Sequence, residues 1–153
     1  MEKIGLASKA AEMLTSGQIP REVMTIFRAV QSPHRPEGDD FEYVMNGVVL
    51  GHSREDDEIC LDLDTGRILL MASWHPESPL VVNTDLEAFA KSLQTLLALS
   101  PLYGDTADLD DAERAEARVR NAIEEIDATS TIDPNGFWSA FLDDVGVGDY
   151  RGW

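Results

Sequence analysis

The sequence contains one motif on which an enzyme could be built, the tripeptide Asp64-Thr65-Gly66. Aspartic proteases carry a catalytic carboxylate in such a D-T-G loop, and two of these carboxylates share a proton about 3 Å apart. This chain has no second D-T-G or D-S-G, and much of it is predicted to be helical, unlike the small dimeric proteases. Arg67 follows the glycine, where a cation would lower the pKa of a neighbouring carboxylate. We therefore interpret the tripeptide as a turn, in which aspartate accepts hydrogen bonds from backbone amides and glycine takes a positive φ.

The other polar residues do not have the spacing of a metal or catalytic site. Asp62 and Asp64 match the start of a calcium-binding loop, but Ser73 stands at the twelfth position, where that loop needs a bidentate glutamate. No serine lies in a nucleophile elbow, and the three histidines are not spaced as metal ligands: His34, His52 and His75. A site built from His52 and a distant acidic partner stays open as an alternative. Otherwise we predict no catalytic residue, no metal ligand and no cofactor.

The charge balance is the most unusual bulk property of the chain. It has 12 Lys and Arg against 29 Asp and Glu, a formal net charge of -17. Nucleic acid and anionic membranes attract proteins through cationic side chains, so we expect the chain to bind neither directly. The same field would steer a basic protein partner toward the chain and raise the association rate. Solubility is the alternative explanation of the acidity.

The acids are concentrated between residues 37 and 64, where ten Asp and Glu accompany a single cation, Arg54. We predict that carboxylates of this segment steer association with a basic partner, which makes them the expected partner-binding residues. They are Glu55, Asp56, Asp57, Glu58, Asp62 and Asp64. An ordinary solvated surface is the alternative interpretation.

The sequence carries no signal for a membrane or for secretion. No stretch approaches the ~18 consecutive apolar residues of a membrane span, and the first residues lack a basic leader followed by an apolar run. The single cysteine, Cys60, excludes an intrachain disulfide and a cysteine-based zinc site, and we interpret it as a buried structural thiol. We therefore expect a cytoplasmic protein.

The hydrophobic periodicity changes from helical to alternating and back to helical along the chain. Helical spacing predicts a first helix from Glu2 to a stop near Gly17, and a second from Pro20 to Val30. Alternation then predicts strands at 41–45 and 48–52, joined by a two-residue turn at Asn46-Gly47, and further strands at 59–64, 67–74 and 80–82.

Three further helices are predicted after the strands. One starts at Thr84, with Glu87 completing a capping box, and a second spans about 108–128. The last follows Asp133 as N-cap and Pro134 as first helical residue. This order predicts one α+β domain over residues 1–153, with a mostly antiparallel sheet of four to six strands and helices packed on one side.

Five motifs, in their order along the chain, resemble the SUKH superfamily, in particular its fourth subgroup of bacterial immunity proteins with an SMI/KNR-like domain. They extend over about residues 15–150 and read GQIP, YVMNGVVLG, ICLDLDTGRILLM, VVNTDLEAFAKSLQTL and FWSAFLDDVGVGDY. Two positions depart from the pattern: Gln18 and Ile19 precede Pro20 where the family often has Gly-Leu, and Asp85 stands where many members have serine.

The resemblance implies an α+β fold and a cytosolic, non-enzymatic antidote that binds and neutralises a cognate polymorphic toxin domain, often a nuclease or nucleic-acid deaminase. An acidic surface suits this role, because it can occlude the basic active-site surface of such a toxin. Some superfamily members are scaffolds, so a regulatory or scaffold module unrelated to a toxin is the alternative. We expect a monomer or a weak dimer.

Overall fold

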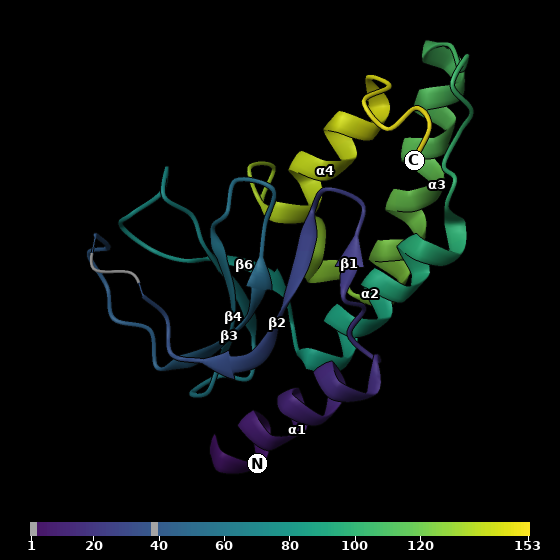
Figure 1. Cartoon of the computed structure of the whole chain (residues 1–153). Coiled ribbons are helices and arrows are strands. Elements are labelled where there is room, and N and C mark those ends of the chain that lie inside the picture. The colour runs from purple at the N-terminus through teal and green to yellow at the C-terminus, as the bar shows by residue number, and fades with distance from the viewer. Residues whose placement is uncertain (1–2, 38–39) are drawn as a thin grey trace.

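The computed structural model describes residues 3–37 and 40–153. This part of the chain contains four α-helices, one 3-10 helix and six strands (Figure 1). In chain order they are α1 (Lys3–Ser16), β1 (Glu22–Val23), β2 (Phe27–His34), β3 (Gly47–His52), β4 (Glu58–Asp62), β5 (Ile68–Met71), β6 (Leu80–Asn83), α2 (Leu86–Leu99), α3 (Leu109–Ile126), η1 (Ala128–Thr131) and α4 (Phe137–Gly146). The first helix ends where expected, at Gly17 with φ of 84°, whereas its predicted start at Glu2 lies outside the described residues.

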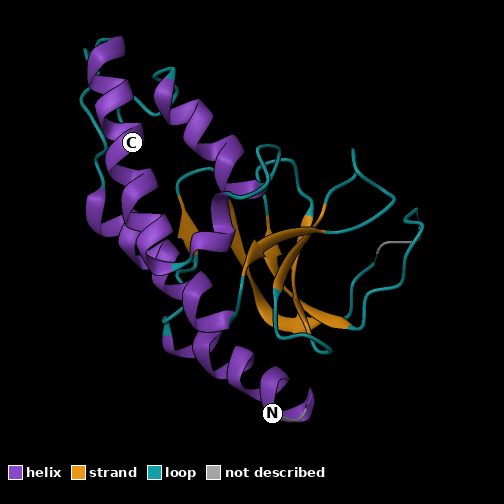
Figure 2. Ribbon diagram, turned by 180° about the vertical axis from the view of Figure 1, so that it is seen from behind, coloured by secondary structure: helices purple, strands orange, loops and turns teal. Residues whose placement is uncertain are grey.

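The strands form one antiparallel sheet in which each strand pairs with the next one along the chain, in the order β1 to β6. Figure 2 shows the helices gathered along one side of this sheet. Fully buried side chains from both layers meet there, among them Leu50, Ile59, Phe89, Leu93 and Trp138. The predicted α+β class, with a mostly antiparallel sheet and helices on one side, is confirmed.

The helix predicted from Pro20 to Val30 is wrong, because this segment forms β1, a tight turn and the start of β2. Val23 pairs with Phe27 across the turn, and Met24 within it has φ of 48°. Such a turn brings residues four apart into contact, as one turn of a helix does. The apolar spacing of Val23 and Phe27 is therefore the same in a hairpin as in a helix, and periodicity alone did not distinguish them.

The strand predicted at 41–45 and its two-residue turn are also wrong. Residues 41–45 have no regular secondary structure, and Gly47 begins β3, where it pairs with Asp62 of β4. The segment instead packs on the sheet face that the helices leave uncovered, and the side chains that meet there are Phe41, Tyr43 and Met45 from the segment with Val49, Cys60 and Met71 from the sheet. The alternation of large side chains in 41–45 thus comes from a chain that covers the sheet rather than from one that joins it.

Strand β4 is buried on both of its faces, as Cys60 shows. This cysteine is completely buried, as expected for a structural thiol. Three consecutive residues, Ile59 to Leu61, are buried, because helices cover one face of β4 and residues 41–45 cover the other.

A buried hydrogen-bond network joins β6 to the helices through Asn83. Its side-chain Oδ1 accepts from Trp138 Nε1 (3.0 Å), and its Nδ2 donates to Asp127 Oδ2 (3.0 Å) and to Ser92 Oγ (3.4 Å). Asn83 and Trp138 are both fully buried. Two motifs that carry the family resemblance, V-N-T and F-W, therefore meet in the core, where they hold α2, η1 and α4 onto the sheet.

Two predicted helix starts are displaced. The N-cap of α2 is Asp85, whose carboxylate accepts from Ala88 N (2.8 Å), while the Thr84 hydroxyl donates to Asp127. Helix α4 begins only at Phe137, and Asp133 shapes the preceding turn by accepting from Asn135 N (2.9 Å). Helix α3 lies within its predicted range.

Candidate functional site

The D-T-G tripeptide forms the turn between β4 and β5, as predicted. Gly66 has φ of 78°, and its N–H donates to the backbone oxygen of Asp62 (2.8 Å). The carboxylate that shapes the turn is that of Asp62, which accepts from Asp64 N (3.0 Å) and from the Thr65 hydroxyl (2.6 Å). The Asp64 carboxylate instead accepts from Asn46 Nδ2 (3.0 Å). The turn needs these residue types for its own geometry, so the motif supplies no evidence of protease chemistry.

The six predicted partner-binding acids do not form one patch. Glu58 is the first residue of β4 and Asp62 the last, so the strand separates them by about 13 Å at ~3.3 Å per residue. Glu55, Asp56 and Asp57 lie with Glu58 at one end, in the β3–β4 turn. Asp62 and Asp64 lie at the other end, in the β4–β5 turn. The sequence placed the six residues close together, whereas the strand divides them into two groups.

Three acids of the β3–β4 group, Asp56, Asp57 and Glu58, line a hollow of about 460 Å³ that we call the acidic hollow. Five carboxylates from two segments line it, and no Lys or Arg does so in the described chain. The lining residues are Glu37, Asp40, Phe41, His52, Asp56, Asp57, Glu58, Met71, Ser73 and Pro76. The end of β3, the turn after it, the end of β5 and the segment before residue 41 thus position the hollow jointly.

Asp57 is the unusual member of this group, because its side chain is buried, with 8% exposed. One carboxylate oxygen, Oδ1, accepts from Ser73 N (3.2 Å). The other, Oδ2, is buried and has no hydrogen-bond partner within the described part of the chain. A buried carboxylate oxygen without a donor is costly, and such groups in native proteins call for an explanation. Asp57 is therefore unsuited to long-range steering and suited to direct contact with a cation.

The neighbouring acids are more exposed and each has one contact. Asp56 pairs with Arg28 (2.6 Å), and Glu58 Oε1 accepts from Glu37 N (3.0 Å). Exposed ion pairs contribute little to stability, so these carboxylates remain able to exchange partners. Asp56 has φ of 67°, which lets the turn direct the next residue, Asp57, inward.

The negative charge beside the hollow also affects two buried groups of the outer sheet face. Burial, then Cys60 and Asp57, raise the pKa of Tyr43 to about 12, and its hydroxyl has no hydrogen-bond partner among the described residues. Burial, then the charge of Glu58, raise the pKa of the Cys60 thiol, so the cysteine stays protonated. Both shifts favour the neutral form, as expected in a region where the nearby charges are negative.

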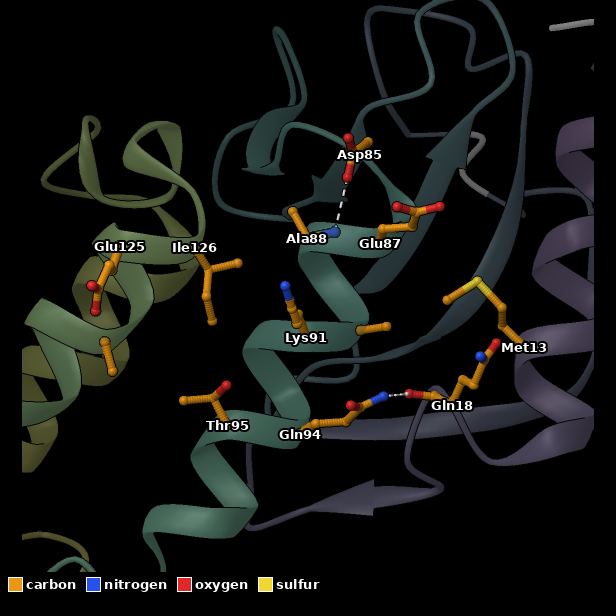
Figure 3. A pocket seen from close by; sticks show the side chains of 12 residues that line it. Met13, Gln18, Asp85, Glu87, Ala88, Lys91, Gln94, Thr95, Glu125 and Ile126 are labelled. Atoms are coloured by element: carbon orange, nitrogen blue, oxygen red, sulfur yellow. Dashed lines mark hydrogen bonds between the residues drawn. The ribbon is translucent and has the colours of Figure 1, made fainter.

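A larger groove of about 710 Å³ lies between α1, α2 and α3 (Figure 3). Several of its polar groups already have partners: Asp85 caps α2, Gln94 Nε2 donates to Gln18 O (2.6 Å), and Glu87 pairs with Lys9 (2.5 Å). The hydrogen bond and charge of Lys9 lower the pKa of Glu87. The groove is thus larger than the acidic hollow, but it lacks a buried polar atom that needs a ligand.

The three histidines lie in different local surroundings. His52 lines the acidic hollow, yet in the portion of the chain that the structure describes no hydrogen bond joins it to a carboxylate. His75 contacts Glu77 (3.1 Å), and His34 contacts the backbone of Arg35. Among residues 3–37 and 40–153, no three His, Cys, Asp or Glu side chains are grouped so that they could hold a metal ion.

One residue of this region was missed at the sequence level. Trp74 follows β5 and is 54% exposed, next to Ser73, whose N–H binds Asp57. Its exposure follows from the end of β5 at Met71, three residues earlier than predicted. Sequence reasoning extended the strand through Trp74 and so assigned it no role.

No curated protein and no solved structure matches the chain. None of the helices in the described residues is both long enough and apolar enough to cross a membrane. The model of the SUKH-4 immunity protein family matches residues 1–144, nearly the range over which the motifs suggested it. The chain therefore belongs to the SUKH-4 immunity protein family, whose membership supports an immunity role that involves binding a cognate toxin protein.

Proposed function

We propose that this protein neutralises a cognate bacterial polymorphic toxin domain, of the nuclease or nucleic-acid deaminase type, by occluding its basic active-site surface. It acts in the cytoplasm by stoichiometric binding and without an enzymatic reaction. The observation that carries the proposal is the acidic hollow, where a buried carboxylate oxygen without a donor lies among four further acids. Family membership supports the role, and the hollow supports the mode of binding.

The physical argument rests on charge complementarity. A toxin that acts on nucleic acid must attract phosphates, so its active-site surface carries Lys and Arg side chains. Carboxylates can bind these Lys and Arg side chains in place of phosphates. The net charge of -17 also attracts a basic toxin over a long range. Steered association can reach 10⁸–10⁹ M⁻¹s⁻¹, about a thousandfold above an unsteered protein pair.

The predicted binding residues acquire different roles in this proposal. Glu55, Asp56 and Glu58 are accessible and would steer the toxin toward the hollow. Asp62 and Asp64 lie beyond a Debye length of ~8 Å from them, so they would act as a second, weaker group. Asp57 would contact the toxin directly.

The first experiment tests complex formation. The purified protein is mixed at equimolar amount with the toxin domain encoded by a neighbouring gene, followed by size exclusion and an assay of toxin activity on DNA or RNA. We expect a 1:1 complex and loss of toxin activity. A fully active toxin that elutes alone would overturn the proposal, and capture of a non-toxin partner instead would favour the scaffold alternative.

The second experiment tests steering with two variants of equal net charge. One carries Glu55→Lys, Asp56→Lys and Glu58→Lys in the β3–β4 turn beside the hollow, and its control carries three reversals on exposed helical positions: Glu12→Lys, Asp110→Lys and Glu113→Lys. We expect the hollow variant to associate at least tenfold more slowly than the control at 50 mM salt, with a smaller difference at 500 mM. Equal association rates for the two variants would show that only net charge matters and would remove the assignment.

A further inference from the structure

The exposed Trp74 lies on a short ridge, residues 73–76, that follows β5. Ser73 and Pro76 line the acidic hollow, whereas Trp74 lines a second, smaller hollow of about 100 Å³ that we call the apolar notch. The β3–β4 turn is shared in the same way, with Asp56, Asp57 and Glu58 at the acidic hollow and Ser53, Arg54 and Glu55 at the notch. The two hollows are therefore neighbours, separated by the ridge and the turn.

The notch is lined mainly by apolar side chains, with one buried polar group, the Ser53 hydroxyl, and charged residues at its edge. Its floor consists of core side chains, namely Ile26, Leu70, Phe137, Phe141 and Tyr150. At the rim, Arg54 pairs with Asp144 (3.2 Å) and lies 3.5 Å from Glu55, so its charge is already compensated. The notch thus suits an apolar side chain rather than an anion.

The ridge and the turn are held in place before any partner binds. Ser73 N donates to Asp57 Oδ1 (3.2 Å), His75 N donates to the backbone oxygen of Ala72 (3.0 Å), and Ser53 N donates to the backbone oxygen of Asp57 (2.9 Å). The His75 ring lies against Trp74, with 5.9 Å between ring centroids, and contacts Glu77 and the Ser78 backbone. A rigid surface loses little conformational entropy on binding, which favours affinity.

We propose that these two hollows form a bipartite socket for a loop of the partner protein that carries a cationic side chain close to an apolar one. The cation enters the acidic hollow and supplies the hydrogen-bond donor that Asp57 Oδ2 lacks, and the apolar side chain fills the notch beside Trp74. This rests on the proposed function only in that the toxin provides the loop. Arginine fits best, because its guanidinium binds carboxylates in pairs and stacks on aromatic rings.

In this proposal Trp74 and the arginine of the partner are the anchor residues of the interface. Tryptophan and arginine dominate the binding energy of protein interfaces when they are packed at the centre and surrounded by contacts that exclude water. Here Trp74 lines the apolar notch and follows Ser73, which lines the acidic hollow, and 54% of the Trp74 surface is available for such packing. Helix α4 contributes Phe137 and Phe141 to the notch, so the same helix that carries the family motif also supports the socket.

The test is an NMR titration of the ¹⁵N-labelled protein with short peptides, Ac-Arg-(Gly)n-Leu-NH₂ with n from 0 to 3. The comparison probes are Ac-Glu-(Gly)n-Leu-NH₂, Ac-Arg-NH₂ and Ac-Leu-NH₂. We expect one Arg-Leu spacing to shift the Trp74 indole and the Asp57 and Ser73 amide signals together, with a millimolar Kd at least fivefold lower than that of either single amino acid. Equal binding of the Glu-Leu peptides, or shifts confined to the groove between α1, α2 and α3, would overturn the proposal.

Variants separate the socket from general effects. Asp57→Asn and Trp74→Ala should each raise the peptide Kd at least fivefold, whereas Trp153→Ala, which removes a similarly exposed tryptophan outside the notch, should not. Circular dichroism confirms that each variant is folded before it is titrated. An unchanged Kd in both Asp57→Asn and Trp74→Ala would refute the socket.

The socket proposal and the proposed function can fail independently of each other. If the toxin forms a 1:1 complex that Trp74→Ala leaves unaltered, the immunity proposal stands and the socket fails. If the peptides bind at the socket but the neighbouring toxin is not captured, the socket stands and the toxin assignment fails.

Discussion

Two buried aspartates differ so strongly in their surroundings that the same substitution should destabilise the protein at one position and not at the other. Asp127, 7% exposed, accepts four hydrogen bonds: from Asn83 Nδ2 (3.0 Å), Thr84 N (2.7 Å), Thr84 Oγ1 (2.8 Å) and Thr129 N (3.1 Å). Asp57 accepts one, from Ser73 N, and has a buried oxygen without a partner in the described chain. We compare Asp127→Asn with Asp57→Asn.

The expected magnitudes follow from these contacts. An asparagine at 127 turns one oxygen into a donor that faces the Thr129 or Thr84 amide, so one backbone N–H loses its partner at about 1–2 kcal/mol. The two or three remaining bonds weaken from charged to neutral acceptors, and the total loss is about 3 kcal/mol. At 57, asparagine keeps the bond to Ser73 and removes an uncompensated charge, so the free energy of unfolding should stay equal or rise by about 1 kcal/mol.

The pH dependence gives a second, independent check. Burial opposes ionisation of Asp127, but the hydrogen bonds from Thr84, Asn83 and Thr129 outweigh it and hold the pKa below its ordinary value. A carboxyl whose folded pKa is depressed stabilises the protein above its unfolded pKa of about 3.9, and this contribution is lost as the pH falls through the folded pKa. The stability difference between the parent and Asp127→Asn should therefore be constant above about pH 5 and shrink below about pH 4.

Urea unfolding followed by circular dichroism measures both effects. Asp56→Asn serves as the control, because it loses only an exposed ion pair with Arg28 and should change stability by about 0.5 kcal/mol or less. The reasoning is refuted if Asp57→Asn destabilises the protein as much as Asp127→Asn, or if the Asp127→Asn difference does not narrow in acid.

Three further predictions concern other parts of the sheet. In Gly51→Ala the new Cβ would lie 2.4 Å from the Phe27 ring and 2.5 Å from the backbone oxygen of Arg28. Urea unfolding should therefore show a free energy of unfolding that is lower by about 2–3 kcal/mol. The control Gly104→Ala, at an open site, should change it little. The Cys60 thiol, buried and with a raised pKa, should not react with Ellman's reagent at pH 8 in the native protein and should react fully in urea; native reactivity would contradict its burial. Spectrophotometric titration should show a phenol that ionises near pH 12 and is absent in Tyr43→Phe. Because the pKa of Tyr43 is raised, its contribution to stability is present below about pH 10 and is lost as the pH rises toward 12. A Tyr43 transition near pH 10 would contradict the raised pKa.

The elements that could be predicted from the sequence are those whose pattern has one structural solution. Helix α3 has a capping aspartate, Asp108, and a long apolar stripe, and β4 and β5 flank a turn whose residues fit no regular element. The hairpin at Val23 and the covering segment around Tyr43 were assigned wrongly, because local spacing does not report which partner a side chain packs against. That information depends on tertiary contacts between segments far apart in the chain.

The candidate site was predictable only in its charge. The run from Glu55 to Glu58 directed attention to the β3–β4 turn, but the sequence did not show that Asp57 turns inward while Asp56 and Glu58 stay accessible. That difference arises from the positive φ at Asp56 and from the amide of Ser73, a residue on another strand end. Trp74 was missed for the same reason, since its exposure depends on where β5 ends rather than on its neighbours in sequence.

Asp127 and Asp57 also differ in whether their hydrogen-bonding positions are satisfied within the fold. Asp127 has a donor for each of its hydrogen-bonding positions, so a partner can add nothing to it. Asp57 has an oxygen without a partner among the described residues, beside an acidic opening, and in the proposed socket a cation of the partner would supply the missing donor. Salt screens the exposed acids far more than a buried pair. Raising the salt concentration should therefore slow association, through Glu55, Asp56 and Glu58, more than it speeds dissociation, through Asp57, and the reverse dependence would show that the buried carboxylate is not part of the interface.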